Sequence, residues 1–196
     1  VVTWREEGTP QGGPLSPLLA NVLLDEVDKE LEQRGHTFVR YADDLNVYVG
    51  SKRAGERVMQ ALRGKYARLK LQVNEDKSAV APVEERKFLG FTLCLYRKDV
   101  WAMLAETTVQ RYKERVRRLT RRTAGRSIRT VVSTLNQYLR GWYGYFGHSD
   151  SHKTLNEMQQ WTRRRLRQVQ LHLWKHGRGT YLGLRRLGVD ERRAKE

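Results

Sequence analysis

The sequence has only one cysteine, Cys94, in 196 residues. A single cysteine excludes a disulfide within the chain and a cysteine-rich zinc site. No apolar run approaches the roughly 20 residues that a membrane-spanning helix needs. The first residues also lack the charged region and apolar stretch that are typical of a signal peptide. These absences predict a protein of a reducing, cytoplasmic compartment with no membrane partner. The start at Val1 rather than at a methionine hints at a fragment.

Acidic residues are scarce in the second half of the chain. Residues 1–98 carry 16 Lys and Arg against 14 Asp and Glu, whereas residues 99–196 carry 22 against 8, a net charge of +14 out of +16 for the whole chain. A near-neutral half joined to a very basic half predicts a core domain followed by a domain that binds a polyanion. The alternative is a basic surface that serves only solubility.

Hydrophobic periodicity predicts an α+β fold. Apolar residues recur at helical spacing from Leu15 to Leu31, and Gly35 is expected to end that helix. Residues 37–49 alternate as two short strands around a tight Ala-Asp-Asp turn. Further helices and strands are expected along the rest of the chain. The further helices are 52–70, 107–122, 127–146 and 154–175, and the further strands are 78–81, 88–95 and 99–104.

Two adjacent carboxylates, Asp43 and Asp44, lie in the turn of this otherwise apolar hairpin. They repel each other, so a fold gains little from the pair unless a cation binds there. Mg²⁺ prefers such oxygen ligands together with substrate phosphates, and two-metal phosphoryl transfer requires a clamp of this kind. The alternative is an ordinary Asp-Asp hairpin turn without a metal.

The motifs around the turn favour the metal-binding interpretation. Tyr41-Ala42-Asp43-Asp44 follows Gln11-Gly12 at the distance of one helix, and Lys77 and then Phe88-Leu89-Gly90-Phe91 come after it. This ordered set resembles the polymerase blocks of reverse transcriptases of the group II intron type, over about residues 8–95. The stretches 135–146 and 161–167, rich in tryptophan, tyrosine and arginine, look like the maturase-specific thumb of the same family.

The resemblance implies roles for individual residues. Asp43 and Asp44 would be catalytic and would bind Mg²⁺ or Mn²⁺. Residues near the template and the incoming nucleotide would be Gln11, Gly12, Tyr41, Ala42 and Lys77. Leu89 and Gly90 would support the primer end.

The resemblance also implies a domain organisation. Residues 1–105 would be the C-terminal portion of a reverse transcriptase palm, an antiparallel sheet with helices. Residues 106–196 would be an all-α, basic thumb. The fingers and the first palm strand, which carries a further metal-binding aspartate in the family, would lie before Val1. The chain alone is therefore expected to be inactive as a polymerase.

Arginines spaced four, three and four residues apart from Arg111 to Arg122 share one face of the predicted helix 107–122. We expect them, with other basic residues of the second half, to bind RNA. The expected RNA-binding residues are Arg111, Arg115, Arg118, Arg122, Arg140, Arg163, Arg164, Arg165, Arg167 and Lys175. Most of the aromatic rings between them are expected to form the core of a helical bundle.

The function that the resemblance implies is that of an intron-encoded RNA-directed DNA polymerase and splicing maturase in the bacterial cytoplasm. Its partners would be group II intron RNA, an RNA template with a DNA primer, and target DNA. Two alternatives stay open: a splicing module that binds RNA without polymerising, and a truncated remnant of a mobile element. The intact Tyr41-to-Asp44 motif argues against decay within this segment.

Overall fold

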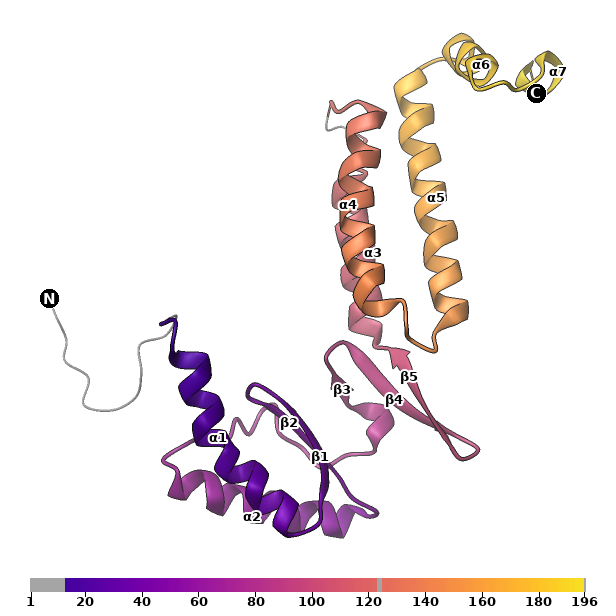
Figure 1. The fold of residues 1–196 in the computed structure, drawn as a ribbon. Coiled ribbons are helices and arrows are strands. Elements are labelled where there is room, and N and C mark those ends of the chain that lie inside the picture. The colour runs from indigo at the N-terminus through magenta and orange to yellow at the C-terminus, as the bar shows by residue number, and fades with distance from the viewer. Residues whose placement is uncertain (1–12, 123–124, 196) are drawn as a thin grey trace, which may run out of the picture. The chain divides into compact units, whose positions relative to one another are not determined.

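The computed structural model describes residues 13–122 and 125–195, and it divides the chain into two compact units, Val1–Phe88 and Leu89–Glu196. Helices predominate in both, and the strands form small antiparallel sheets (Figure 1). The predicted α+β class is thus confirmed. In the part of the chain that the structure describes, we find no helix with the length and hydrophobicity of a membrane span.

The first unit combines two helices with a β-hairpin. Its elements are α1 (Ser16–Gln33), β1 (Thr37–Tyr41), β2 (Asp44–Tyr48), α2 (Lys52–Arg68), the 3-10 helix η1 (Val83–Glu85) and the short strand β3 (Lys87–Phe88). As predicted, α1 ends before Gly35, which has a φ of 69° that glycine adopts without strain. Ser51 begins α2, because its Oγ accepts a hydrogen bond of 3.2 Å from the Ala54 N–H.

The core of this unit lies between the C-terminal half of α1, the hairpin and α2. Leu24, Val27 and Leu31 are buried and contact Phe38 and Leu45, among other side chains of the hairpin and α2. The N-terminal half of α1 is exposed, although its apolar residues continue the helical spacing of the buried half. Leu15, Leu18, Leu19, Val22 and Leu23 are exposed, because no described residue covers that half of the helix.

The second unit is a β-hairpin followed by helices. Its elements are β4 (Phe91–Tyr96), β5 (Asp99–Leu104), α3 (Glu106–Leu119), α4 (Ile128–Phe146), α5 (His152–Trp174), α6 (Gly177–Arg186) and α7 (Glu191–Lys195). Helices α3, α4 and α5 lie side by side as a bundle (Figure 1). The loop before α5 holds the hairpin, because the Asp150 carboxylate and the Ser151 Oγ accept backbone hydrogen bonds of 2.7 Å from Ala102 and Leu104.

Aromatic rings fill the centre of the bundle, as expected. Tyr112 of α3 is buried, and its ring centroid lies 4.7 Å from that of Trp142 on α4. The Tyr112 hydroxyl lies 2.8 Å from Thr162 Oγ1 on α5. The single hydrogen of the Thr162 hydroxyl is donated to the Met158 carbonyl, so Tyr112 is the donor to Thr162. Burial raises the pKa of Tyr112 to about 12.

Several predicted elements differ from the structure. Residues 78–81 form no strand, and the expected strand 88–95 is interrupted by a turn at Leu89-Gly90. Helix α3 ends at Leu119, so Arg122 lies beyond it, and α6 and α7 were not predicted. The spatial division at Phe88 places the β4–β5 hairpin with the helices. The boundary between family domains at about residue 105 stays a prediction.

Candidate functional site

The Asp-Asp motif occupies a two-residue β-turn. Strands β1 and β2 pair in antiparallel register with Tyr41 opposite Asp44, so the turn consists of Ala42 and Asp43, and Asp44 already belongs to β2. Ala42 has a φ of 54°. Such left-handed backbone fits the twist of tight hairpins, but it costs a residue with a side chain roughly 1–2 kcal/mol. This strained residue directly precedes the first carboxylate.

The strand alternation separates the two faces of the hairpin. Phe38 and Leu45 contact the core, whereas Tyr41 and Asp44 lie on the opposite face, with Tyr41 63% exposed. Both Asp43 and Asp44 are exposed. Within the described ranges, no hydrogen bond or ion pair involves either carboxylate. Arg40, which precedes Tyr41, is bound to Asp28 and does not neutralise them.

The donor set of the turn fits part of a magnesium site. Two free carboxylates supply hard oxygen ligands of the kind that Mg²⁺ prefers. No group of three or more His, Cys, Asp or Glu side chains that could hold a metal occurs in the part of the chain that the structure describes. Asp43 and Asp44 can therefore supply two ligands of a metal centre, and the remaining ligands must come from elsewhere.

The other residues predicted to contact the nucleotide are placed only in part. Gln11 and Gly12 lie outside the described residues. Lys77 is exposed in a turn after α2, where its N–H donates hydrogen bonds of 3.2 Å to the backbone carbonyl and to Oδ1 of Asn74. The Lys77 carbonyl accepts a bond of 2.7 Å from Arg86. The backbone of Lys77 is therefore held in place, while its side chain extends to solvent.

The Leu89-Gly90 turn is built into the helical unit. Both residues have positive φ, 51° and 87°. The Gly90 carbonyl accepts hydrogen bonds from Thr108 Oγ1 at 2.7 Å and from the Ala105 N–H at 3.0 Å. A Cβ at Gly90 would lie 2.9 Å from the Phe146 ring. Glycine is required at position 90 because of the positive φ and because a side chain would clash with the Phe146 ring. The turn is held by contacts with α3 and α4.

Basic side chains exposed on the bundle carry charge that carboxylates of the described residues do not neutralise. Arg111, Arg115 and Arg118 are exposed on α3. No described carboxylate forms an ion pair with any of the ten residues predicted to bind RNA. Exposed with these three are Arg122, Arg140, Arg163, Arg164, Arg167 and Lys175. The arrangement suits a polyanion, because each phosphate would meet cations that have no competing partner.

Arg165 is the exception among the predicted RNA-binding residues. Its Nε and Nη2 donate hydrogen bonds of 3.2 Å to the Oγ1 and the carbonyl of Thr120, at the C-terminal end of α3. Burial, followed by the nearby charges of Arg122 and Arg117, lowers the pKa of Arg165. The structure thus gives Arg165 a packing role between α5 and α3. An RNA contact by this residue stays a prediction.

Sequence reasoning did not single out Arg40. Its signal was present: in the alternation of β1, Arg40 falls on the same face as the core residue Phe38. A charged side chain on an apolar face needs a partner, and Asp28, twelve residues earlier on α1, supplies it. The spacing alone did not reveal that partner.

Two family assignments agree with this geometry. Residues 2–93 match the family described as reverse transcriptase (RNA-dependent DNA polymerase). Residues 109–188 match the family described as group II intron, maturase-specific domain. The first match contains the Asp43–Asp44 turn and Lys77, and the second contains most of the basic bundle.

Curated relatives are similar over parts of the chain. Protein YkfC of Escherichia coli (strain K12) is 31% identical over 145 residues, covering 56% of this chain and 38% of that protein. The retron Ec86 reverse transcriptase of Escherichia coli is 25% identical over 147 residues, covering 72% and 42%. The retron Mx65 reverse transcriptase of Myxococcus xanthus is 39% identical over 75 residues, covering 36% and 17%. The chain spans less than half the length of each of these relatives.

A reverse transcriptase segment and a maturase-specific domain follow one another on this single polypeptide. The exposed Asp-Asp turn lies in the first and the unneutralised basic helices lie in the second. Residues 2–93 therefore belong to the reverse transcriptase family, and residues 109–188 belong to the group II intron maturase-specific domain family.

Proposed function

We propose that these residues form part of an intron-encoded RNA-directed DNA polymerase that is also a splicing maturase, binding intron RNA and copying it into cDNA. The observation that carries the proposal is the tandem order of the two matched families on one chain. Reverse transcriptases generally use divalent metal ions, and the exposed, unpaired carboxylates of Asp43 and Asp44 suit such an ion.

The proposed catalytic turn would hold Mg²⁺, or Mn²⁺, through Asp43 and Asp44. When bound, the metal would stabilise charge on the attacking and leaving oxygens of phosphoryl transfer. Tyr41 and Ala42 directly precede the two carboxylates and would lie near the template and the incoming nucleotide. Gln11, Gly12 and Lys77 would lie near the same substrates. The exposed Lys77 side chain is free to approach a triphosphate. Leu89 and Gly90 would support the primer end.

The proposed RNA interface is the basic face of α3, α4 and α5. The maturase-specific domain implies binding of intron RNA, and structured RNA is recognised mostly through its backbone and shape. An RNA template with its DNA primer, and the target DNA, would be further partners of the whole protein. If five to eight phosphates are neutralised, the logarithm of affinity should fall by roughly several units per tenfold rise in salt.

The decisive test separates polymerisation from splicing. In a protein that joins these 196 residues to the fingers and the first palm strand of a family member, Asp43→Asn should abolish primer extension on an RNA template and leave intron RNA binding nearly intact. Asp76→Asn, a change of an exposed aspartate outside the motif, serves as the matched control. Extension at the wild-type rate in Asp43→Asn would refute the polymerase assignment.

The second candidate function is an RNA-binding splicing module without polymerase activity. The described residues bring only two carboxylates to the turn, so the remaining ligands of a catalytic metal centre would have to come from elsewhere. The 196-residue chain alone is accordingly expected to bind intron RNA without extending a primer. If it extends one, and Asp43→Asn abolishes that activity, a further metal ligand exists in the chain itself.

A further inference from the structure

Arg40 carries a charge on the inward face of the catalytic hairpin. The alternation of β1 places its side chain with Phe38, toward α1, and away from Tyr41 and Asp44. Only 13% of the Arg40 side chain is exposed. A charge that is nearly buried must be paired and hydrogen-bonded. The partners of Arg40 therefore show which parts of the fold it connects.

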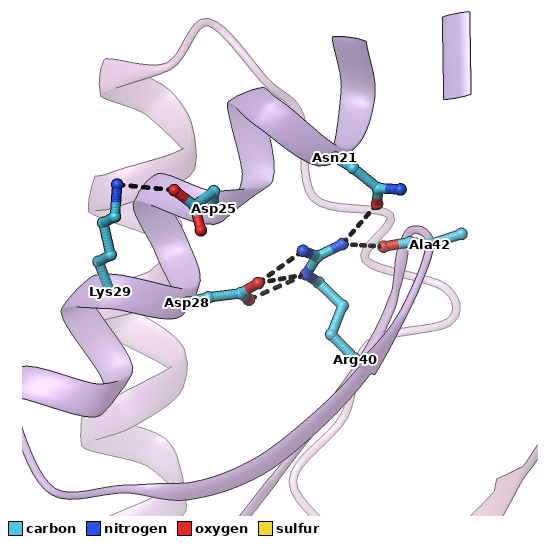
Figure 2. Close-up of polar contacts among 6 residues, drawn as sticks. All are labelled: Asn21, Asp25, Asp28, Lys29, Arg40 and Ala42. Atoms are coloured by element: carbon cyan, nitrogen blue, oxygen red, sulfur yellow. Dashed lines mark hydrogen bonds and ion pairs between the residues drawn. The ribbon is translucent and has the colours of Figure 1, made fainter. Parts of the chain in front are cut away.

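One guanidinium group connects α1 to the turn (Figure 2). Arg40 Nε lies 2.9 Å from both carboxylate oxygens of Asp28, and Nη2 lies 2.5 Å from Asp28 Oδ2. Arg40 Nη1 donates to Asn21 Oδ1 and to the backbone carbonyl of Ala42, each at 2.9 Å. Asn21 and Asp28 are both on α1, so the helix fixes the orientation of the guanidinium plane.

The bond to the Ala42 carbonyl reaches the peptide group that joins Ala42 to Asp43. Ala42 has the left-handed φ of 54°, which is unfavourable for alanine. Such a conformation persists only when its surroundings hold it. Because the carbonyl of Ala42 and the N–H of Asp43 belong to one planar unit, holding that carbonyl also orients the backbone from which the Asp43 side chain extends.

We propose that Arg40 is a positioning residue for the metal-binding turn. Anchored on Asp28 and Asn21, it holds the Ala42–Asp43 peptide so that the carboxylates of Asp43 and Asp44 stay arranged for one cation. The inference rests on the proposed function, in that it assumes a divalent ion at this turn. Arg40 itself does not touch the metal or the substrate.

Lysine cannot replace arginine in this arrangement. A guanidinium presents its N–H groups in a planar fork, whereas an ammonium is a compact point charge. Arg40→Lys therefore keeps the charge opposite Asp28 but cannot at the same time bind the carboxylate through two nitrogens and reach the Ala42 carbonyl. Arg34→Lys is the matched control, because Arg34 pairs with Glu30 of α1 and makes no contact with the turn.

The experiment titrates Mn²⁺ into the isotopically labelled 196-residue chain and measures paramagnetic broadening of the Asp43 and Asp44 amide signals by NMR. Substitutions of groups that orient metal ligands typically weaken metal affinity 10- to 100-fold. Since Arg40 acts through a peptide group, we expect Arg40→Lys to weaken the apparent Mn²⁺ affinity roughly tenfold. Hydrogen exchange of the Asp44 amide should also accelerate. Arg34→Lys should match the wild type in both measurements.

The outcomes separate the two proposals. If Asp43→Asn leaves the Mn²⁺ broadening unchanged, the turn is not the metal site and the proposed polymerase function fails with it. If Asp43→Asn removes the broadening but Arg40→Lys behaves like Arg34→Lys, only the positioning role is overturned. Should Arg40→Lys unfold the first unit, Asn21→Ala decides instead. That variant keeps the Asp28 pair and should weaken Mn²⁺ affinity in the same direction, and unaltered affinity would overturn the proposal.

Discussion

Replacing Gly90 by alanine tests how firmly the proposed primer-side turn is built into the helical unit. Gly90 has a φ of 87°, and an alanine side chain in left-handed backbone costs roughly 1–2 kcal/mol. The new methyl carbon would lie 2.9 Å from the Phe146 ring, so the ring must shift. Overpacking of this kind typically costs about 1–3 kcal/mol. The expected loss in the free energy of unfolding is therefore about 2–5 kcal/mol.

The assay is urea unfolding of the 196-residue chain, followed through the tryptophan fluorescence of the second unit. Gly141→Ala is the matched control, because Gly141 lies inside α4 and a Cβ there meets nothing within 4 Å. Alanine is favoured over glycine in a helix by about 1 kcal/mol, so this control should raise stability. If Gly90→Ala lowers stability by less than about 0.5 kcal/mol, the steric argument is refuted.

Three further predictions concern the helical unit. Tyr112 is protonated in the fold with a pKa raised to about 12 from 10, so its stabilisation is complete below pH 10 and is lost as pH rises through 12. Tyr112→Phe should reduce the stability lost between pH 10 and pH 12 by about 2 kcal/mol, measured by urea unfolding at the two pH values. Arg165→Ala should lower the free energy of unfolding by about 1 kcal/mol in thermal melts, because the Thr120 carbonyl loses a hydrogen-bond donor. The control is Arg163→Ala, which removes an exposed side chain and should change the free energy of unfolding by less than about 0.5 kcal/mol. Replacing four arginines by alanine should leave the fold intact and weaken binding to many RNA sequences in filter-binding assays. The four are Arg111, Arg115, Arg118 and Arg122. The RNA affinity should also depend less steeply on salt. A salt slope equal to that of the wild type would contradict the proposed RNA interface.

Local signals predicted much of the fold. The helical stripe ending at Gly35, the alternation around Ala42 and Asp43, and the basic helices 127–146 and 154–175 are patterns within one element, and each element formed within a few residues of its predicted bounds. These patterns arise because side chains repeat with the period of the backbone. The prediction of a strand at residues 78–81 was wrong. A short apolar run forms a strand only where a neighbouring strand is available to pair with it, and the run itself does not show whether one is.

Contacts between distant residues were not predictable in the same way. Nothing in the sequence around Thr120, at the end of α3, indicated that Arg165 on another helix would donate a hydrogen bond to its carbonyl, so the packing role of Arg165 was not predicted. The exposure of Leu18 and Val22 on α1 depends on which segments cover the helix, and a helical stripe does not contain that information.

The Leu89-Gly90 turn connects the two proposed activities. In sequence it belongs to the polymerase motifs, but its hydrogen bonds go to Thr108 and Ala105 at the start of α3. Arg111, one helical turn after Thr108, belongs to the proposed RNA interface. Because α3 is a continuous helix, RNA bound at Arg111 and the turn held by Thr108 share one rigid element. A change in Gly90 that loosens this element would therefore disturb the proposed RNA binding and the proposed primer support together.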